Sequence, residues 1–260
     1  MSIRNIKLFA VSVIALTLLT GCGNDTDGAY SQITDQRDHA SLTASVSSSS
    51  TTSDVGTVAS SSDTSSVPDK VPNADELVLI SEYIPDAVID LKYATTDNFT
   101  KQKIYSFKEP SLRYGTVKKL AKAQKQLKKK GYTLLIWDAY RPTAAQKKFW
   151  DICPDPKYVS DPSKGFTNHC RGNTVDVSIL KTDGSPVTMP SDFDDFSKLA
   201  DRDYSDVSKD AAKNSVLLES VMTDCGFKGY SGEWWHYTDT DTYPVVSDRS
   251  YRPKMQINPN

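Results

Sequence analysis

The chain has 260 residues, of which 38 % are hydrophobic and 25 % are charged, and its formal net charge is -2. This composition is that of an ordinary globular protein and excludes collagen-like, coiled-coil and multi-span membrane proteins. The small net charge argues against a protein that binds nucleic acid mainly through phosphate contacts, so no nucleic-acid partner is expected.

The N-terminus has the features of an export signal. A short positively charged start precedes an apolar run over residues 8–19, which is shorter than the ~20 residues that cross a bilayer. Leu19-Thr20-Gly21-Cys22 then resembles the lipobox of bacterial lipoproteins, in which the cysteine carries the lipid. An ordinary signal peptide with an unrelated cysteine is the alternative. We therefore expect residues 1–22 to be a lipoprotein signal peptide and Cys22 to anchor an exported protein to a bacterial cell membrane, on its outer face or periplasmic side.

Residues 23–70 are predicted to form a disordered linker. Ser and Thr make up most of residues 41–66, and Tyr30 is the only aromatic residue of the linker. So little apolar surface cannot offset the conformational entropy that is lost when a chain becomes ordered. The linker is expected to act as a flexible tether for the part of the chain that follows.

Apolar periodicity and aromatic residues return over residues 71–260, which are predicted to form one compact domain. The predicted elements are, in chain order, a helix over 116–130, a strand over 132–137, a helix from about 142, a strand over 174–179, a helix over 209–224 and a strand over 234–238. Thr143 and Gln146 match a capping box at the start of the second helix. Because helices and strands mix without a regular βαβ rhythm, we expect an α+β fold with a mainly antiparallel sheet packed by helices.

Two of the three histidines lie in unusual segments of this domain. His169 precedes the predicted strand 174–179, Asp176 lies on the polar side of that strand, and Gly172 permits a turn between them. Together with His236 they provide two imidazoles and one carboxylate, which leaves the fourth position of a tetrahedral metal site open for water. From the spacing alone, a His–Asp hydrogen bond without a metal is an equally good interpretation.

A carboxylate precedes the second histidine. Glu233 lies three residues before His236, and a carboxylate beside an activated water can accept its proton and pass it to a leaving amine. Side chains alternate along an ideal strand, which would put these two on opposite faces. We therefore expect Glu233 at the bent entrance of the strand; a surface glutamate at a turn is the alternative.

A cation ends the predicted strand 132–137. Pro142 disfavours helical dihedral angles at Arg141, so the guanidinium can project from the end of the strand. A fixed cation there can stabilise the oxyanion of a tetrahedral intermediate. A structural salt bridge with Asp138 is the alternative.

These segments resemble a known family. Thr167-x-His169-x-x-Gly172-x-Thr174-x-Asp176 resembles the S-x-H-x-x-G-x-A-x-D motif of zinc D-Ala-D-Ala peptidases, and Glu233-Trp-Trp-His236 resembles their E-x-x-H motif. Residues 90–99, 138–142 and 229–237 are similar, more narrowly, to the D-alanyl-D-alanine dipeptidases of vancomycin resistance (the VanX type). The likeness extends from about residue 81 to residue 237.

The resemblance implies a set of roles. One Zn²⁺ per chain would lie at the sheet, bound by His169, Asp176 and His236. Glu233 would be the general base and acid, and Arg141 would stabilise the transition state. Asp194 would bind the substrate ammonium, and Thr167 would lie near its carboxylate.

The family motif is not matched at every position. Thr167 replaces a serine but keeps the hydroxyl, whereas Thr174 replaces an alanine. The extra bulk of Thr174 is expected to change the rim of the site.

The implied reaction is hydrolysis of the D-Ala-D-Ala dipeptide to two D-alanines. A D,D-carboxypeptidase that trims peptidoglycan stem peptides is the nearest alternative, because a lipoprotein faces the cell wall. A non-catalytic lipoprotein that binds the cell wall is an alternative of another class.

Three cysteines remain besides the one in the lipobox. Cys225 falls on the apolar side of the predicted helix 209–224 and is expected in the core. Cys153 and Cys170 both occupy loops, and the exported setting permits a disulfide, so these two are the expected pair. Cys170 as an additional zinc ligand is the alternative.

Overall fold

The computed structural model describes residues 71–247. The predicted signal peptide, the lipidated Cys22 and the linker over 23–70 lie outside the described residues and remain predictions. None of the helices within residues 71–247 is long and apolar enough to cross a membrane.

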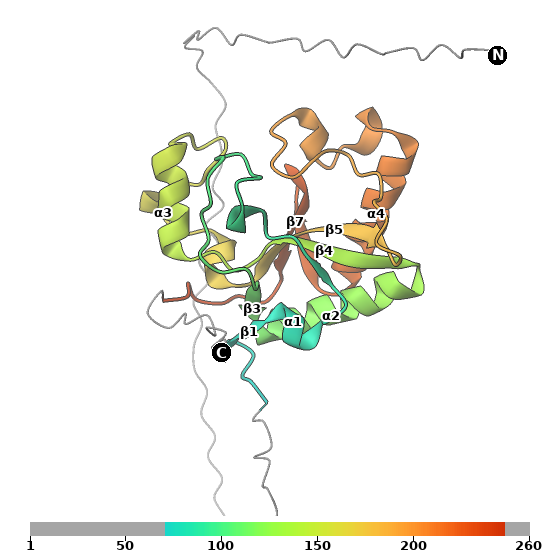
Figure 1. Cartoon of the computed structure of the whole chain (residues 1–260), viewed down its shortest axis with the longest axis horizontal. Coiled ribbons are helices and arrows are strands. Elements are labelled where there is room, and N and C mark those ends of the chain that lie inside the picture. Colours follow the sequence, from blue (N-terminus) through green and yellow to red (C-terminus); the bar gives the residue numbers. More distant parts are fainter. Residues whose placement is uncertain (1–70, 248–260) are drawn as a thin grey trace, which may run out of the picture. The chain divides into compact units, whose positions relative to one another are not determined.

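The described residues form four α-helices, five short 3₁₀ helices and seven strands (Figure 1). The α-helices are α1 (Ile80–Tyr83), α2 (Tyr114–Lys129), α3 (Thr143–Ile152) and α4 (Lys209–Asp224). The strands are β1 (Leu77–Leu79), β2 (Val88–Ile89), β3 (Ser111–Arg113), β4 (Tyr132–Asp138), β5 (Thr174–Lys181), β6 (Phe227–Tyr230) and β7 (Glu233–Asp239). The 3₁₀ helices are η1 (Lys92–Ala94), η2 (Pro162–Lys164), η3 (Asn168–Arg171), η4 (Lys198–Ala200) and η5 (Tyr204–Asp206).

The principal sheet has five strands in the order β2-β4-β5-β7-β6. Only β2 and β4 run parallel, and all other neighbours in this sheet are antiparallel. A separate antiparallel pair joins β1 to β3. These observations confirm the predicted α+β fold with a mainly antiparallel sheet.

The long helices begin and end close to their predicted bounds. A glycine with positive φ follows each of them, Gly131 after α2 and Gly226 after α4, and this left-handed conformation is typical of a helix C-terminus. The capping-box prediction for α3 is wrong, because Pro142 is the N-cap residue and no side chain caps the helix. Gln146 instead donates to the Ser160 carbonyl and accepts a hydrogen bond from Arg141.

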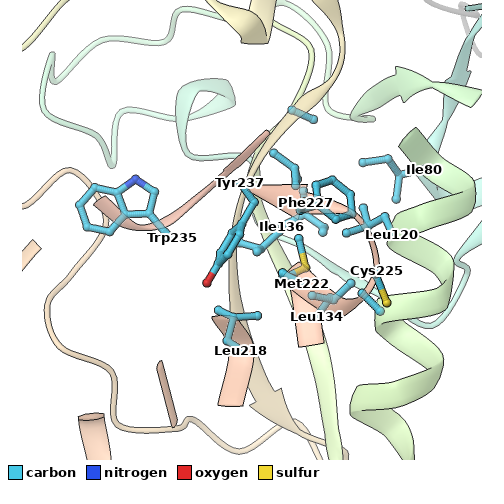
Figure 2. Packing of buried hydrophobic residues seen from close by; sticks show 14 of the residues in the cluster. Ile80, Leu120, Leu134, Ile136, Leu218, Met222, Cys225, Phe227, Trp235 and Tyr237 are labelled. Carbon is cyan, nitrogen blue, oxygen red and sulfur yellow. The ribbon is translucent and has the colours of Figure 1, made fainter. Parts of the chain in front are cut away.

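One face of the sheet carries the main hydrophobic core. Leu134 and Ile136 of β4 are fully buried there and share the core with Leu120 of α2 and Leu218 and Met222 of α4 (Figure 2). Alternation along β5 adds three further core residues, which are Val175, Val177 and Ile179. Helices α2 and α4 therefore cover this face of the sheet.

The opposite face of the sheet carries the polar side chains of β5. Asp176 alternates with the core residues of its strand, and it lies directly across from His236 of β7 in the antiparallel register. A second apolar cluster, which includes Tyr93, Tyr105 and Phe149, packs outside the main core. The candidate site therefore lies on the face of the sheet that α2 and α4 leave uncovered.

Candidate metal centre

The first histidine is positioned by a short turn. His169 lies in η3, which ends at Gly172 with φ +75°, a left-handed conformation that favours glycine. A Cβ atom at Gly172 would also lie 2.8 Å from a methyl group of Leu77. The Nδ1 atom of His169 donates to the Ala139 carbonyl over 2.8 Å, so its Nε2 atom has a free lone pair.

The three predicted ligands meet at the sheet. Nε2 of His169 lies 3.3 Å from Oδ2 of Asp176, and Nδ1 of His236 lies 3.0 Å from Oδ1 of the same carboxylate. One ligand atom from each residue lies within 4.8 Å of the other two. The structure therefore brings together the residues that the sequence places far apart.

This arrangement fits a metal ion. Ligand atoms bound tetrahedrally at ~2.0–2.1 Å lie about 3.3 Å apart, close to the separations between the Asp176 oxygens and the imidazole nitrogens. The Oδ1 atom of Asp176 is buried, and no group of the described residues donates a hydrogen bond to it. A buried acceptor without a donor is rare in folded proteins, and a cation between the three side chains would satisfy it.

Electrostatics favour the charged form of the shared carboxylate. Burial works to raise the pKa of Asp176, but the neighbouring imidazoles of His169 and then His236 outweigh it and lower the pKa. The carboxylate is therefore ionised at neutral pH and can act as a metal ligand.

Glu233 lies beside the metal ligands because β7 is irregular. Tyr230 of β6 pairs with Glu233, but its neighbour Gly229 already pairs with Tyr237. This register shift, a β-bulge, re-aims the side chains, and Oε2 of Glu233 lies 3.4 Å from Nδ1 of His236. Glu233 is the first residue of β7 and thus lies at the bent start of the strand, where the sequence predicted it. Burial raises the pKa of Glu233, which suits a residue that must take up a proton.

Arg141 forms the salt bridge that the sequence offered as an alternative to catalysis. Its Nη2 atom lies 2.8 Å from Oδ2 of the fully buried Asp138, and its Nη1 atom donates to Gln146. The guanidinium also lies over the ring of Phe149, with Cζ 4.8 Å from the ring centre. These contacts fix the cation firmly, and its charge partly opposes the rise in the pKa of Glu233 that burial causes. The salt bridge therefore orients Arg141 close to the site.

Asp194 occupies a half-buried position with positive φ. Both of its carboxylate oxygens accept hydrogen bonds from the Tyr93 hydroxyl, at 3.1 and 3.0 Å. Burial, and next the charge of Asp176, raise the pKa of Asp194 to about 8. It lines a cavity of about 400 Å³ together with Trp137 and Phe193. Tyr93 was not predicted as a site residue from the sequence, although it lies in the segment 90–99 that resembles the family.

The two threonines that depart from the family motif lie in different surroundings. Thr167 is the N-cap residue of η3, two residues before His169, and its hydroxyl lies 3.7 Å from the Cys170 sulfur. Thr174 is fully buried, and its hydroxyl forms a 2.9 Å hydrogen bond with that of Thr238. Thr174 lies on the same side of β5 as Asp176, and its effect on the rim of the site remains a prediction.

The predicted Cys153–Cys170 disulfide is wrong, since neither cysteine forms a disulfide in the structure. Cys170 is fully buried in η3, whereas Cys153 caps the end of α3 and packs against the second apolar cluster. Cys170 is also not one of the residues whose ligand atoms converge on a common point. The prediction for Cys225 is confirmed, because it lies in the main core.

Known proteins are similar in sequence to most of the part of the chain that the structure describes. The family model described as D-Ala-D-Ala dipeptidase (Peptidase_M15) matches residues 73–255. The D-alanyl-D-alanine dipeptidase of Escherichia coli (strain K12) is 37% identical over 176 residues, which cover 67% of this chain and 91% of that protein. The D-alanyl-D-alanine dipeptidase of Enterococcus faecium is 33% identical over 176 residues, which cover 60% of this chain and 87% of the relative. The D-alanyl-D-alanine dipeptidase of Streptomyces coelicolor is 30% identical over 184 residues, which cover 63% of this chain and 91% of that protein. The chain belongs to the D-Ala-D-Ala dipeptidase family of peptidases and is a metallopeptidase.

Proposed function

We propose that this protein is a zinc D,D-dipeptidase that hydrolyses D-Ala-D-Ala to two D-alanines. The observation that carries the proposal is the convergence of His169, Asp176 and His236 around a buried carboxylate oxygen that lacks a donor, with Glu233 alongside. One Zn²⁺ per chain would be held by these three ligands. Such an ion lowers the pKa of a bound water toward ~7 and polarises a carbonyl group.

The protein's own groups would move the protons. Glu233 accepts a proton from the attacking water at its carboxylate and later gives it to the nitrogen of the leaving D-alanine. The water oxygen forms a bond with the peptide carbon as the carbonyl double bond opens, and the C–N bond breaks when that double bond forms again. Arg141, held by Asp138, stabilises the negative charge that develops on the carbonyl oxygen.

A carboxylate with a raised pKa supports a dipeptide as the substrate. Burial and the charge of Asp176 raise the pKa of Asp194, and the free ammonium of a dipeptide would stabilise the ionised carboxylate. The amino group of the corresponding residue in a stem peptide is acylated and carries no charge. Thr167, next to the ligand turn, would lie near the carboxylate at the other end of the dipeptide.

The predicted anchor favours a second candidate, a D,D-carboxypeptidase. A lipidated Cys22 would place the domain outside the cell membrane, where peptidoglycan stem peptides are present. Processing of the full chain tests this location: an inhibitor of lipoprotein signal peptidase should leave an unprocessed precursor. Normal processing under that inhibitor would contradict the lipid anchor.

A substrate comparison separates the two activities. The metal-replete protein is incubated with free D-Ala-D-Ala, with N-acetyl-D-Ala-D-Ala and with a stem pentapeptide, and released D-alanine is measured. We expect fast cleavage of the free dipeptide only, and Asp194→Asn should raise KM for it while hardly changing the slow cleavage of the acetylated compound. Preferred cleavage of the pentapeptide would instead establish the carboxypeptidase. A metal-bound protein that cleaves none of the three would exclude both activities.

A further inference from the structure

A buried arginine contacts the strand that carries His236 and Glu233. Arg202 lies in the loop between η4 and η5, and only 11% of its side chain is exposed. No step of the proposed reaction uses it, and no feature of the sequence singled it out. Its contacts are nevertheless concentrated on β6 and β7.

The guanidinium of Arg202 donates hydrogen bonds to the backbone at the β-bulge. Its Nε atom donates to the Tyr230 carbonyl over 2.8 Å, and its Nη2 atom donates to the His236 carbonyl over 3.0 Å. These carbonyls belong to the two strands that change register between Gly229 and Tyr230. A forked cation that bonds both carbonyls fixes the distance between them in a way that a single donor cannot.

The close approach of the guanidinium requires a glycine in β6. A Cβ atom at Gly229 would lie 2.4 Å from Cζ of Arg202 and 2.6 Å from Nη2. The space above this residue is therefore filled by the guanidinium, and any larger side chain would displace it.

The residues that hold Arg202 lie on the face of the sheet opposite the candidate metal ligands. Its Cζ atom lies 4.5 Å from the ring centre of Tyr237, which points into the main core with Leu218 of α4 (Figure 2). Its Nη1 atom lies 3.1 Å from Oε2 of Glu219 in α4, and the hydroxyl of Tyr204 donates to the same oxygen. The guanidinium is thus anchored to α4 and contacts β7 on the side of the main core.

We propose that Arg202 is a positioning residue of the metal centre, which holds β7 at the bulge that brings Glu233 to the side of His236 and fixes the peptide group of His236 opposite Asp176. This inference rests on the metal role proposed for His236. In a regular strand the side chains of residues 233 and 236 point to opposite faces. Fixing the His236 carbonyl also fixes the plane of its peptide group and hence the direction of the imidazole.

Metal affinity tests the inference without reference to turnover. The metal-free protein is titrated with Zn²⁺ against a competing chelator, and its Co²⁺ form is followed by visible absorption. We expect Arg202→Ala to raise the Kd for Zn²⁺ about 10- to 100-fold, which is the usual effect of losing a group that orients a ligand. The Co²⁺ spectrum should change with it, and kcat should fall more than KM rises.

Two further variants test the geometry rather than the charge alone. Arg202→Lys keeps the charge but loses the fork, so we expect a smaller rise in the Kd. Gly229→Ala keeps Arg202 but displaces its guanidinium, so it should reproduce the effect of Arg202→Ala. Added guanidinium ion should partly restore Zn²⁺ affinity to Arg202→Ala, whereas methylammonium should not.

A matched control removes a different cation, from helix α2, that contacts the same strand. Lys119 pairs with Asp239 at the far end of β7. Lys119→Met should lower the thermal stability but leave the Kd for Zn²⁺ within twofold of the native value. If Arg202→Ala or the folded Gly229→Ala variant binds Zn²⁺ with native affinity and an unchanged Co²⁺ spectrum, Arg202 has no positioning role. Failure of the native protein to bind Zn²⁺ would instead overturn the proposed function.

Discussion

Asp176 and His236 are direct partners across the β5–β7 ladder, and Oδ1 of the carboxylate lies 3.0 Å from Nδ1 of the imidazole. The sheet itself thus sets the distance between two metal ligands. His169 approaches the other carboxylate oxygen from a turn that precedes β5. Two ligands on a rigid sheet and one on a short turn give a site that largely exists before an ion binds.

Removal of an imidazole should abolish metal binding and activity together. His169→Ala and His236→Ala each leave only two protein ligands, one fewer than catalytic zinc sites use. Metal analysis after dialysis, combined with a turnover assay, checks this. A variant that retained one Zn²⁺ and native turnover would show that its histidine is not a ligand.

Glu233→Ala should separate metal binding from catalysis. The ligand set is intact in this variant, so one Zn²⁺ should remain bound, while loss of the general base should lower kcat about 10²- to 10⁴-fold. The comparison with His236→Ala, measured in parallel, distinguishes loss of the base from loss of the ion. Full activity of a metal-loaded Glu233→Ala protein would refute the assigned mechanism.

Arg141→Met should affect both rate and stability. Loss of an oxyanion-stabilising donor lowers kcat about 10²- to 10³-fold. Because Asp138 is completely buried, its unpaired charge should also lower the free energy of unfolding by about 3–5 kcal/mol. Denaturant unfolding and turnover per metal-bound molecule measure the two effects. A variant with the expected loss of stability but native kcat would leave Arg141 a purely structural role.

Asp194 should make the metal-free protein less stable as the pH rises. Its pKa is about 8 in the folded protein against an ordinary value of 3.8, so the folded state holds this proton more tightly than the unfolded state. The resulting contribution is fully present below about pH 4 and is lost as the pH rises to about 8.

Asp194→Asn removes this dependence. Relative to the native protein, its free energy of unfolding should therefore increase between pH 4 and pH 8, by a few kcal/mol at most. Denaturant unfolding of both metal-free proteins at several pH values measures the difference, with Asp192→Asn, an exposed neighbour, as the control. A constant difference across this pH range would contradict the burial of an uncompensated carboxylate at Asp194.

The long helices and the residues of the candidate metal site were predictable because their signals are local. Apolar spacing and a following glycine define α2 and α4, and the ligand residues lie in short motifs whose spacing is visible in the sequence. Strand pairing is not local, so the direct pairing of Asp176 with His236 could be seen only in the folded chain.

Contacts between distant segments account for what the sequence did not predict. The hydrogen bonds from Tyr93 to Asp194, and those from Arg202 to the β-bulge, join residues far apart in the chain. The failed disulfide prediction has the same origin: both cysteines were placed in loops, but nothing in the sequence indicates that Cys170 is buried within the turn that carries His169.

Thiol titration checks this correction. In the absence of reductant, the denatured domain should expose three reactive thiols, from Cys153, Cys170 and Cys225. Added reductant should not increase this number. The native domain should react fastest at the half-buried Cys153. Detection of one thiol without reductant and three with it would instead show that Cys153 and Cys170 form a disulfide.

The ligand shell of the ion tests the central claim most directly. X-ray absorption at the zinc edge of the metal-loaded domain should show only nitrogen and oxygen ligands at ~2.0–2.1 Å, two of them imidazoles, with no sulfur at ~2.3 Å. A sulfur ligand, or a shell with fewer than two imidazoles, would contradict a metal centre formed by His169, Asp176 and His236.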